Sequence, residues 1–207
     1  MNLMRRFMRI FFHLLYHPFA FAYDLVAAVV SFGKWNDWVF SIIPFIEGTR
    51  ILELGHGPGH LQRILLDRGM VAAAMDESAP MGRLAKRRVG SSHRLTRGLA
   101  QKIPFASESF DSVVSTFPSE YIFDTQTLSE AKRVLRNGGR LIVLPAAMPK
   151  SRFLQWLYKV TGESPAALDE ILQNRFKAPL VKAGFTTEIE IVEVKSSTLI
   201  FVIAHKG

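Results

Sequence analysis

The chain has 207 residues, of which 48% are hydrophobic, a length and composition that suit one domain with a sizeable core. It contains no cysteine, which excludes disulfides, thiolate metal sites and thiol chemistry, and its six histidines show no spacing typical of metal ligands, so we expect no metal. The net charge of +8 favours an anionic environment such as a membrane surface, nucleic acid or an acidic metabolite, although a charge bias without a specific partner would give the same count.

Residues 1–47 are predicted to form an N-terminal helical segment. Within it, residues 1–16 have the pattern of a basic amphipathic helix, with apolar side chains at helical spacing and three arginines opposite. Such a helix either lies in a membrane interface or packs on the domain as a lid with solvated arginines. Pro18 ends it, and residues 19–32 and 35–45 predict two further apolar-rich helices. The apolar run is interrupted before it reaches spanning length. We therefore expect a cytoplasmic protein, either free or peripheral at the inner face of the membrane.

The stretch from Arg50 to His60 reads RILELGHGPGH, a strand, a glycine loop and the start of a helix. Glycines at alternate positions allow positive φ and let the backbone approach a ligand, to which the first helical turn offers unpaired N–H groups. A dinucleotide fingerprint would need a third glycine where His60 stands, and a P-loop would need a lysine. The loop is therefore predicted to hold a ligand that is not bound by its phosphates.

Alternating strands and helices follow along the chain. The strands are predicted at residues 50–55, 71–76, 93–97, 111–116 and 140–145. This order predicts a doubly wound, mostly parallel α/β sheet with helices on both faces, formed by residues 48–207. A helix over residues 148–160 would cover a pocket or join a basic membrane-facing surface. A further helix from residue 164 toward Gly184 is followed by an antiparallel hairpin, residues 186–194 and 198–205.

Asp76 ends the second apolar run, about 20 residues beyond the glycine loop, where α/β nucleotide folds place a carboxylate that accepts hydrogen bonds from ribose hydroxyls. Ser78 is predicted to cap the helix that follows.

Four segments in this order resemble the class I S-adenosylmethionine (SAM)-dependent methyltransferases, in particular the ubiquinone/menaquinone type. They are the ExGxGxG pattern of Glu53 to Gly59, the D-x-S-x-x-M pattern of Asp76 to Met81, the segments GLAQKIPF and FDSVV from Gly98 to Val114, and LSEAKRVLRNGGRLIVL from Leu128 to Leu144. The resemblance implies a Rossmann-like, seven-stranded fold with N-terminal lid helices, and SAM as the cofactor.

The resemblance also implies a set of residues that bind SAM. These are Tyr23, Glu53, Gly55, His56, Gly57, Gly59, Asp76, Glu77, Met81, Ala100, Gln101 and Thr116. Tyr23 either hydrogen-bonds the cofactor or lines the core. Leu99 departs from the family, because an acidic residue there often receives the adenine amino group. Adenine would then be held by backbone near Ala100, by the Gln101 side chain or by apolar contacts.

Residues after the fourth strand are candidates for catalysis. Glu120 and Tyr121 are predicted to face the transferred methyl group, with His56 as a third candidate; alternatively, Tyr121 belongs to the core, Glu120 is solvated and His56 makes a structural hydrogen bond. The stretch lacks the Asn/Asp-Pro-Pro-Tyr motif of many nucleic-acid methyltransferases. Because the lid regions are rich in Phe, Trp and Met, we expect a small or lipidic apolar acceptor. The alternatives are a nucleic-acid methyltransferase and a non-catalytic, SAM-binding membrane-peripheral protein.

Overall fold

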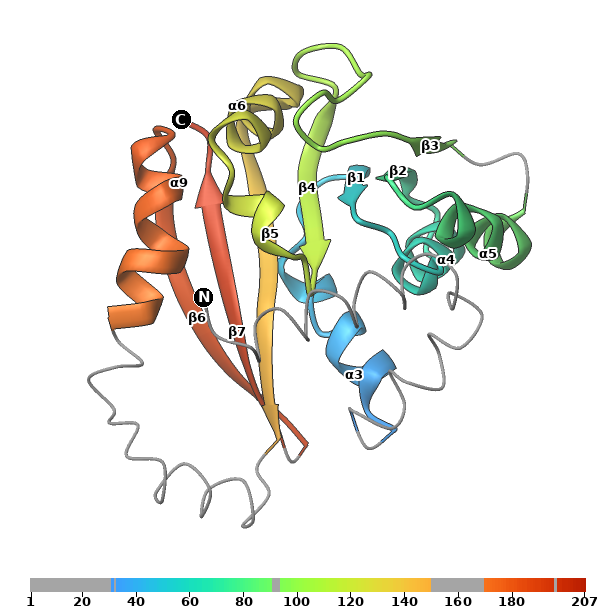
Figure 1. The fold of residues 1–207 in the computed structure, drawn as a ribbon, viewed down its shortest axis with the longest axis horizontal. Helices are drawn as coiled ribbons and strands as arrows, with labels where there is room; N and C mark the ends of the chain where they lie inside the picture. The colour runs from blue at the N-terminus through green and yellow to red at the C-terminus, as the bar shows by residue number, and fades with distance from the viewer. Residues whose placement is uncertain (1–30, 32, 91–93, 150–169, 196) are drawn as a thin grey trace, which may run out of the picture.

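A computed structural model describes residues 31, 33–90, 94–149, 170–195 and 197–207. Seven strands form one sheet in the order β3-β2-β1-β4-β5-β7-β6, shown in Figure 1. Their bounds are Arg50–Leu54 (β1), Val71–Asp76 (β2), Arg94–Arg97 (β3), Phe110–Thr116 (β4), Leu135–Pro149 (β5), Thr186–Val194 (β6) and Ser197–His205 (β7). The first five strands are parallel, and β7 is antiparallel to both β5 and β6. The prediction of a mostly parallel seven-stranded sheet with a C-terminal antiparallel hairpin is confirmed.

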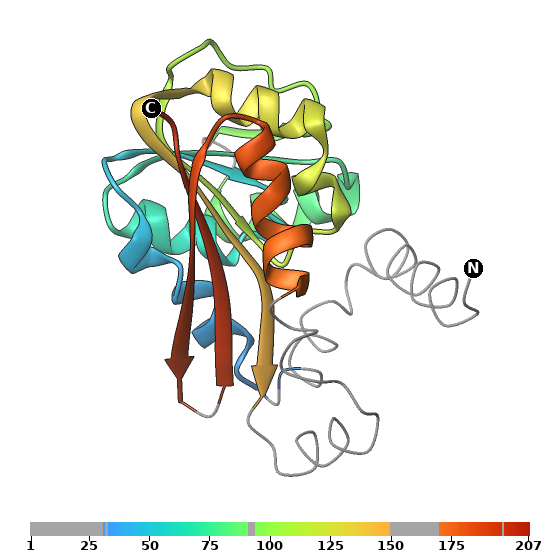
Figure 2. The same cartoon turned by 90° about the vertical axis from the view of Figure 1, so that its left-hand side faces the viewer.

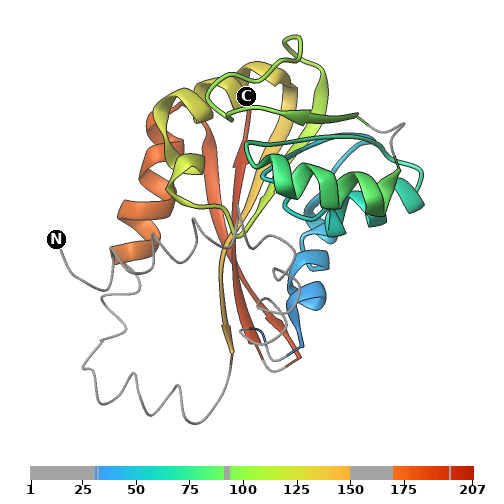
Figure 3. The same ribbon diagram turned by 45° about the vertical axis from the view of Figure 1, so that its right-hand side comes forward.

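Helices cover both faces of the sheet, as Figure 3 shows. They are α3 (Trp35–Phe40), α4 (His60–Asp67), α5 (Ala79–Val89), α6 (Thr125–Val134), α9 (Ala178–Lys182), the 3₁₀ turns η2 (Ile43–Phe45) and η3 (Glu120–Phe123), and the π-helical η4 (Ile171–Lys177). From β1 the chain moves outward to β2 and β3, and right-handed crossovers place α4 and α5 on one face. From β4 it moves the other way, which places α6 on the opposite face. The direction of travel reverses between β1 and β4, where folds of this kind bind ligands.

Alternation along the strands divides the core into two clusters. In β4, Val113 faces the cluster under α6 and α9, whereas the next residue, Val114, faces the cluster under α3 and α4. Both side chains are fully buried. A strand that is covered on both faces therefore buries adjacent side chains and not only alternate ones.

Strand β5 is longer than the predicted residues 140–145. Its second half pairs with the start of β7, from Ala146 with Ile200 to Pro149 with Ser197, after a register shift that follows Val143. Figure 2 shows β5, β6 and β7 running on together beyond the shorter strands of the sheet. The extension depends on pairing with a strand about 50 residues away, which local sequence does not reveal.

Two predicted helices differ in the structure. The one predicted over residues 35–45 divides into α3 and η2 because Pro44, in the first turn of η2, has no N–H to continue the α-helical ladder. The helix predicted from residue 164 is described only from η4 onward. The helix predicted over residues 1–16 and most of those predicted over residues 19–32 and 148–160 lie outside the described residues. Met148 and Pro149 are described and belong to β5, where they pair with β7, so the predicted helix does not begin at residue 148. Among the helices that are described, none has the length and hydropathy of a membrane-spanning segment.

Asp111 ties β1, β4 and β5 together at the amino end of the sheet. Its carboxylate accepts hydrogen bonds from the backbone N–H groups of Thr49 and Arg50, at 3.0 and 2.9 Å, and ion-pairs with the guanidinium groups of Arg50 and Arg136, both at 2.8 Å. Burial opposes ionisation, but these donors outweigh it and hold the pKa of Asp111 well below its usual range. The group stabilises the scaffold at the edge opposite the predicted site.

Candidate functional site

The loop between β1 and α4 contains three glycines with positive φ: Gly55 (76°), Gly57 (51°) and Gly59 (84°). A Cβ at Gly55 would lie 2.4 Å from the Tyr121 hydroxyl, and one at Gly59 would lie 3.0 Å from the Cβ of Ala85 in α5. A Cβ at Gly57 would meet no atom of the described residues within 4 Å. Gly55 and Gly59 therefore permit packing inside the protein, whereas Gly57 borders open space where a ligand can approach the backbone.

Asp76, at the end of β2, faces this loop. One carboxylate oxygen accepts a hydrogen bond from the Gly57 N–H at 2.9 Å, and the other accepts one from the Ser78 N–H at 2.8 Å. Each carboxylate oxygen can accept more than one hydrogen bond. Asp76 therefore shapes the loop and keeps acceptor capacity at the open side of Gly57. Ser78 caps α5 as predicted, because its hydroxyl accepts a hydrogen bond from the Met81 N–H at 3.3 Å.

Glu53 lies beneath the loop and is almost completely buried, with 1% exposure. The Gln62 amide, equally buried on α4, donates to its carboxyl group at 2.8 Å. Burial raises the pKa of Glu53 to about 8; the hydrogen bond from Gln62 opposes this shift, and the nearby charge of Asp76 adds to it. Glu53 therefore carries a proton at neutral pH.

His56 is also buried, and its Nδ1 lies 2.7 Å from the carbonyl oxygen of Gly57. A carbonyl can only accept, so Nδ1 carries the hydrogen and Nε2 has a lone pair. Burial lowers the pKa of His56, although the charge of Asp76 opposes this shift. The imidazole is therefore neutral at neutral pH.

Tyr121 and Glu120 occupy different surroundings on η3. The Tyr121 hydroxyl donates to the carbonyl oxygen of Leu54 at 3.2 Å, beside the Ser115 hydroxyl, which donates to the same oxygen at 2.7 Å. Its ring packs against the core. The Glu120 side chain is 91% exposed and pairs with Arg175 at 3.0 Å. The fold thus brings Tyr121 and His56 to the loop, while Glu120 faces solvent.

A surface hollow of about 460 Å³ lies beside the ends of β2 and β3, lined by Glu77, Arg97, Gly98 and Leu99. Leu99 is 55% exposed. The other candidate cofactor-binding residues on this side of the site differ from Leu99 in their exposure. Met81 and Ala100 are buried, Gln101 and Thr116 are partly buried, and Tyr23 lies outside the described residues.

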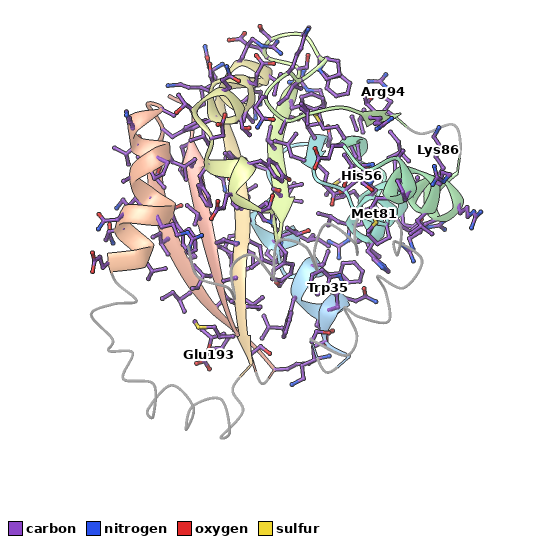
Figure 4. All side chains as sticks on the ribbon, viewed as in Figure 1. Trp35, His56, Met81, Lys86, Arg94 and Glu193 are labelled. Atoms are coloured by element: carbon purple, nitrogen blue, oxygen red, sulfur yellow. The ribbon has the colours of Figure 1, made fainter. Side chains whose placement is uncertain are left out.

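A cluster of rings at the end of β4 was missed by the sequence interpretation. Phe117 directly follows β4, and its ring lies 4.6 Å from that of Trp35 and 6.1 Å from that of Trp38, both on α3. Figure 4 shows Trp35 below His56 and Met81 in this view. The aromatic residues of the segment WNDW were assigned only to a lid helix, because nothing in the local pattern links them to β4. In the described part of the chain, no group of three or more His, Asp or Glu side chains is arranged to hold a metal ion.

Residues 52–143 match the family described as "Methyltransferase domain". A demethylmenaquinone methyltransferase of Symbiobacterium thermophilum is 34% identical over 156 residues, which cover 69% of this chain and 61% of the relative. A ubiquinone/menaquinone biosynthesis C-methyltransferase, UbiE, of Geobacter sulfurreducens is 31% identical over 148 residues, which cover 66% and 58%. The chain spans about three fifths of the length of these relatives.

Solved structures show the same fold at lower identity. A SAM-dependent methyltransferase of Thermotoga maritima, described as a possible histamine N-methyltransferase, superposes with a TM-score of 0.63 at 20% identity, covering 94% of this chain and 99% of the other. A geranyl diphosphate methyltransferase bound to its substrate and sinefungin superposes with a TM-score of 0.58 at 13% identity, covering 83% and 76%. The resemblance predicted from the four sequence segments is confirmed.

Proposed function

On the premise that this chain belongs to the methyltransferase domain family, we propose that it transfers the methyl group of SAM to a small lipophilic acceptor. The observation that carries the proposal is the open space at Gly57, bounded by the acceptor oxygens of Asp76. SAM supplies an electrophilic methyl group on a positively charged sulfur. The chain must bind this cofactor, align it and exclude water.

The residues at the loop fit this task. Gly57 lets the backbone approach the cofactor, and Asp76 accepts hydrogen bonds from the ribose hydroxyls with the lone pairs that Gly57 and Ser78 leave available. Glu77 and Leu99 line the hollow where the adenine end is expected. Glu53, held by Gln62, supports the loop from below.

We infer that His56 is better suited than Glu120 to take a proton from an acidic acceptor. Its neutral ring has an available lone pair on Nε2, whereas Glu120 is exposed and paired with Arg175. The Tyr121 hydroxyl donates a hydrogen bond to the Leu54 carbonyl and so positions the end of β1. We therefore assign it an orienting role beside the loop.

The lipophilic acceptor is supported by the rings at the end of β4 and by the relatives described above, which are named demethylmenaquinone and ubiquinone/menaquinone methyltransferases. Asp76→Ala tests the cofactor site. Calorimetry with S-adenosylhomocysteine should show about 10- to 100-fold weaker binding, because the ribose hydroxyls lose their acceptor. Asp67→Ala, which removes an exposed ion pair with Arg63 on α4, is the control and should bind normally. Equal affinity of the Asp76→Ala variant and the wild type would refute the assignment.

We also propose that the protein associates with anionic membrane surfaces, where a lipophilic acceptor would reside. Within the described residues, α5 exposes Arg83, Lys86 and Arg87, and the neighbouring edge strand β3 exposes Arg94 and Arg97. Figure 4 shows Lys86 and Arg94 on the same side of the molecule. Each basic residue near an anionic bilayer contributes roughly 1 kcal/mol.

Cosedimentation with anionic and neutral vesicles distinguishes the contribution of this basic surface to membrane binding from that of the N-terminal segment. We expect salt-sensitive binding to anionic vesicles, weakened either by removing residues 1–12 or by changing Lys86 and Arg87 to Glu. Unchanged partitioning of both variants would refute the membrane proposal. Preferential, salt-sensitive binding to duplex or single-stranded nucleic acid would instead favour the alternative partner.

A further inference from the structure

Arg97 is the last residue of β3, and its side chain lines the hollow of about 460 Å³ together with Glu77, Gly98 and Leu99. Its Nε donates a hydrogen bond to the backbone carbonyl of Glu77 at 3.0 Å. A guanidinium group has five N–H donors, so four are left for other partners. Among the residues that the structure describes, Arg97 forms no ion pair. The hollow therefore contains an anchored guanidinium group whose charge is not neutralised.

The order of the strands places Arg97 next to Asp76. Strands β2 and β3 are parallel, with Asp76 opposite Arg97 in register, and the Gly98 N–H donates to the Asp76 carbonyl at 3.1 Å. Residues opposite each other in neighbouring strands project to the same face of the sheet. The Arg97 side chain therefore leaves the sheet on the same face as the carboxylate that is assigned above to the ribose hydroxyls.

Arg94 shows what an arginine on this strand does away from the hollow. It lies three residues earlier on β3, is also exposed, and projects to the opposite face, and Figure 4 labels it. A charged side chain of this kind keeps an edge strand from pairing with another chain. Protection of the edge does not require the hydrogen bond to Glu77 or a place in the hollow, so these two features of Arg97 call for a separate reason.

The lining of the hollow suits a purine ring. A guanidinium group is planar, stacks on aromatic rings and attracts the ring face by a cation–π interaction. The hydrogen bond to Glu77 restricts the rotation of this plane. Leu99, two residues further along the chain and 55% exposed, offers an apolar surface to the same hollow. The hollow also has the volume of a typical small-molecule site.

We propose that Arg97 is a specificity-determining residue for the cofactor, because its anchored guanidinium group stacks on the adenine ring in the hollow. This inference rests on the proposed methyltransferase function and deepens it by naming a contact that β3 supplies to the adenine end. Asp76, which contacts the glycine loop through Gly57, lies between that loop and the hollow. Its negative charge therefore separates the guanidinium group from the positively charged sulfur of SAM.

Calorimetry with S-adenosylhomocysteine tests this role of Arg97. Arg97→Leu removes the planar cation and should weaken binding about three- to tenfold. Arg97→Tyr supplies a flat ring without the charge and should bind within about threefold of the wild type, whereas Arg97→Lys keeps the charge without the plane and should bind nearly as weakly as Arg97→Leu. Arg94→Leu is the matched control, because it makes the same change on the opposite face of β3, and it should bind normally. The melting temperatures of the ligand-free variants should equal that of the wild type.

The outcomes separate the two proposals. Wild-type protein that does not bind S-adenosylhomocysteine refutes the proposed function and, with it, the role of Arg97. If the wild type binds, the role of Arg97 alone is overturned when Arg97→Leu binds as tightly as Arg94→Leu does. The stacked geometry is also overturned if Arg97→Lys binds like the wild type while Arg97→Tyr binds as weakly as Arg97→Leu, because the charge would then act without the plane.

Discussion

Glu53→Gln should remove a pH dependence of stability that the wild-type protein shows between pH 7 and pH 8. Burial raises the pKa of Glu53 from 4.5 to about 8. Above about pH 4.5 the unfolded chain has released this proton while the folded protein still holds it, so stability falls as the pH rises toward 8. Above pH 8 the folded protein also loses the proton, and the decline levels off.

The expected change follows from this shift. One proton held only by the folded state costs about 1.4 kcal/mol of unfolding free energy per pH unit. Because a group with a pKa of about 8 is mostly protonated at pH 7 and half protonated at pH 8, the loss over that interval is about 1 kcal/mol. His56 acts in the opposite direction, since its lowered pKa makes stability rise with pH, but only about 0.2 kcal/mol of this rise remains above pH 7 because the unfolded histidine has a pKa of 6.5. The interval above pH 7 therefore isolates Glu53.

Urea unfolding at pH 7.0, 7.5 and 8.0 and constant ionic strength measures the effect. The glutamine side chain of the variant can accept the same hydrogen bond from Gln62 and has no titratable proton. The unfolding free energy of Glu53→Gln should therefore stay constant between pH 7 and pH 8. Glu190→Gln, an exposed change in β6, should keep the wild-type slope. A level wild-type curve, or an equal slope in Glu53→Gln, would refute the reasoning.

Three further changes test other parts of the structure. Asp111→Asn should lower the unfolding free energy by about 2–4 kcal/mol in urea titrations, because it weakens the ion pairs with Arg50 and Arg136, and should leave S-adenosylhomocysteine binding intact; a loss below about 0.5 kcal/mol would contradict this role. Leu99→Asp should keep or improve that binding in calorimetry, since an exposed carboxylate at the hollow can accept from the adenine amino group, whereas loss of binding in a folded variant would count against the placement of adenine. Gly55→Ala should lower the melting temperature, and adding Tyr121→Phe should recover part of the loss because the new methyl group would meet the tyrosine hydroxyl; no recovery would exclude this steric reason.

Local sequence was sufficient to predict the scaffold. Apolar runs separated by helical patterns predicted β1, β2 and β4 to within a residue at each end, and alternation of the two element types predicted the parallel sheet. The glycine loop and the Ser78 cap were also predicted, because backbone conformation and capping depend on residues within one turn of each other. The family resemblance rests on the same short segments.

The surroundings of individual residues, and so the role that each one plays, depend on contacts between parts of the chain that are distant in sequence. The sequence predicted Gly55 as part of a ligand-binding loop, and the structure adds a second reason for glycine there, its position beside the hydroxyl of Tyr121, 66 residues later. The protonated state of Glu53 depends on its burial beside Gln62, a residue for which the sequence predicted only a place in the helix after the glycine loop. Leu99 fills a rim position whose exposure could not be read from its apolar character.

The sequence by itself determined where most of the described strands and helices form and which loop carries the closely spaced glycines, because these features depend on propensity and periodicity over a few residues. The tertiary structure decided that Trp35 meets Phe117, that Asp111 joins three strands and that β5 extends along β7. Each of these contacts joins segments that become neighbours only through the order of strands in the sheet. Burial and electrostatics, which set the chemistry of the site, follow from that order and not from the local pattern of side chains.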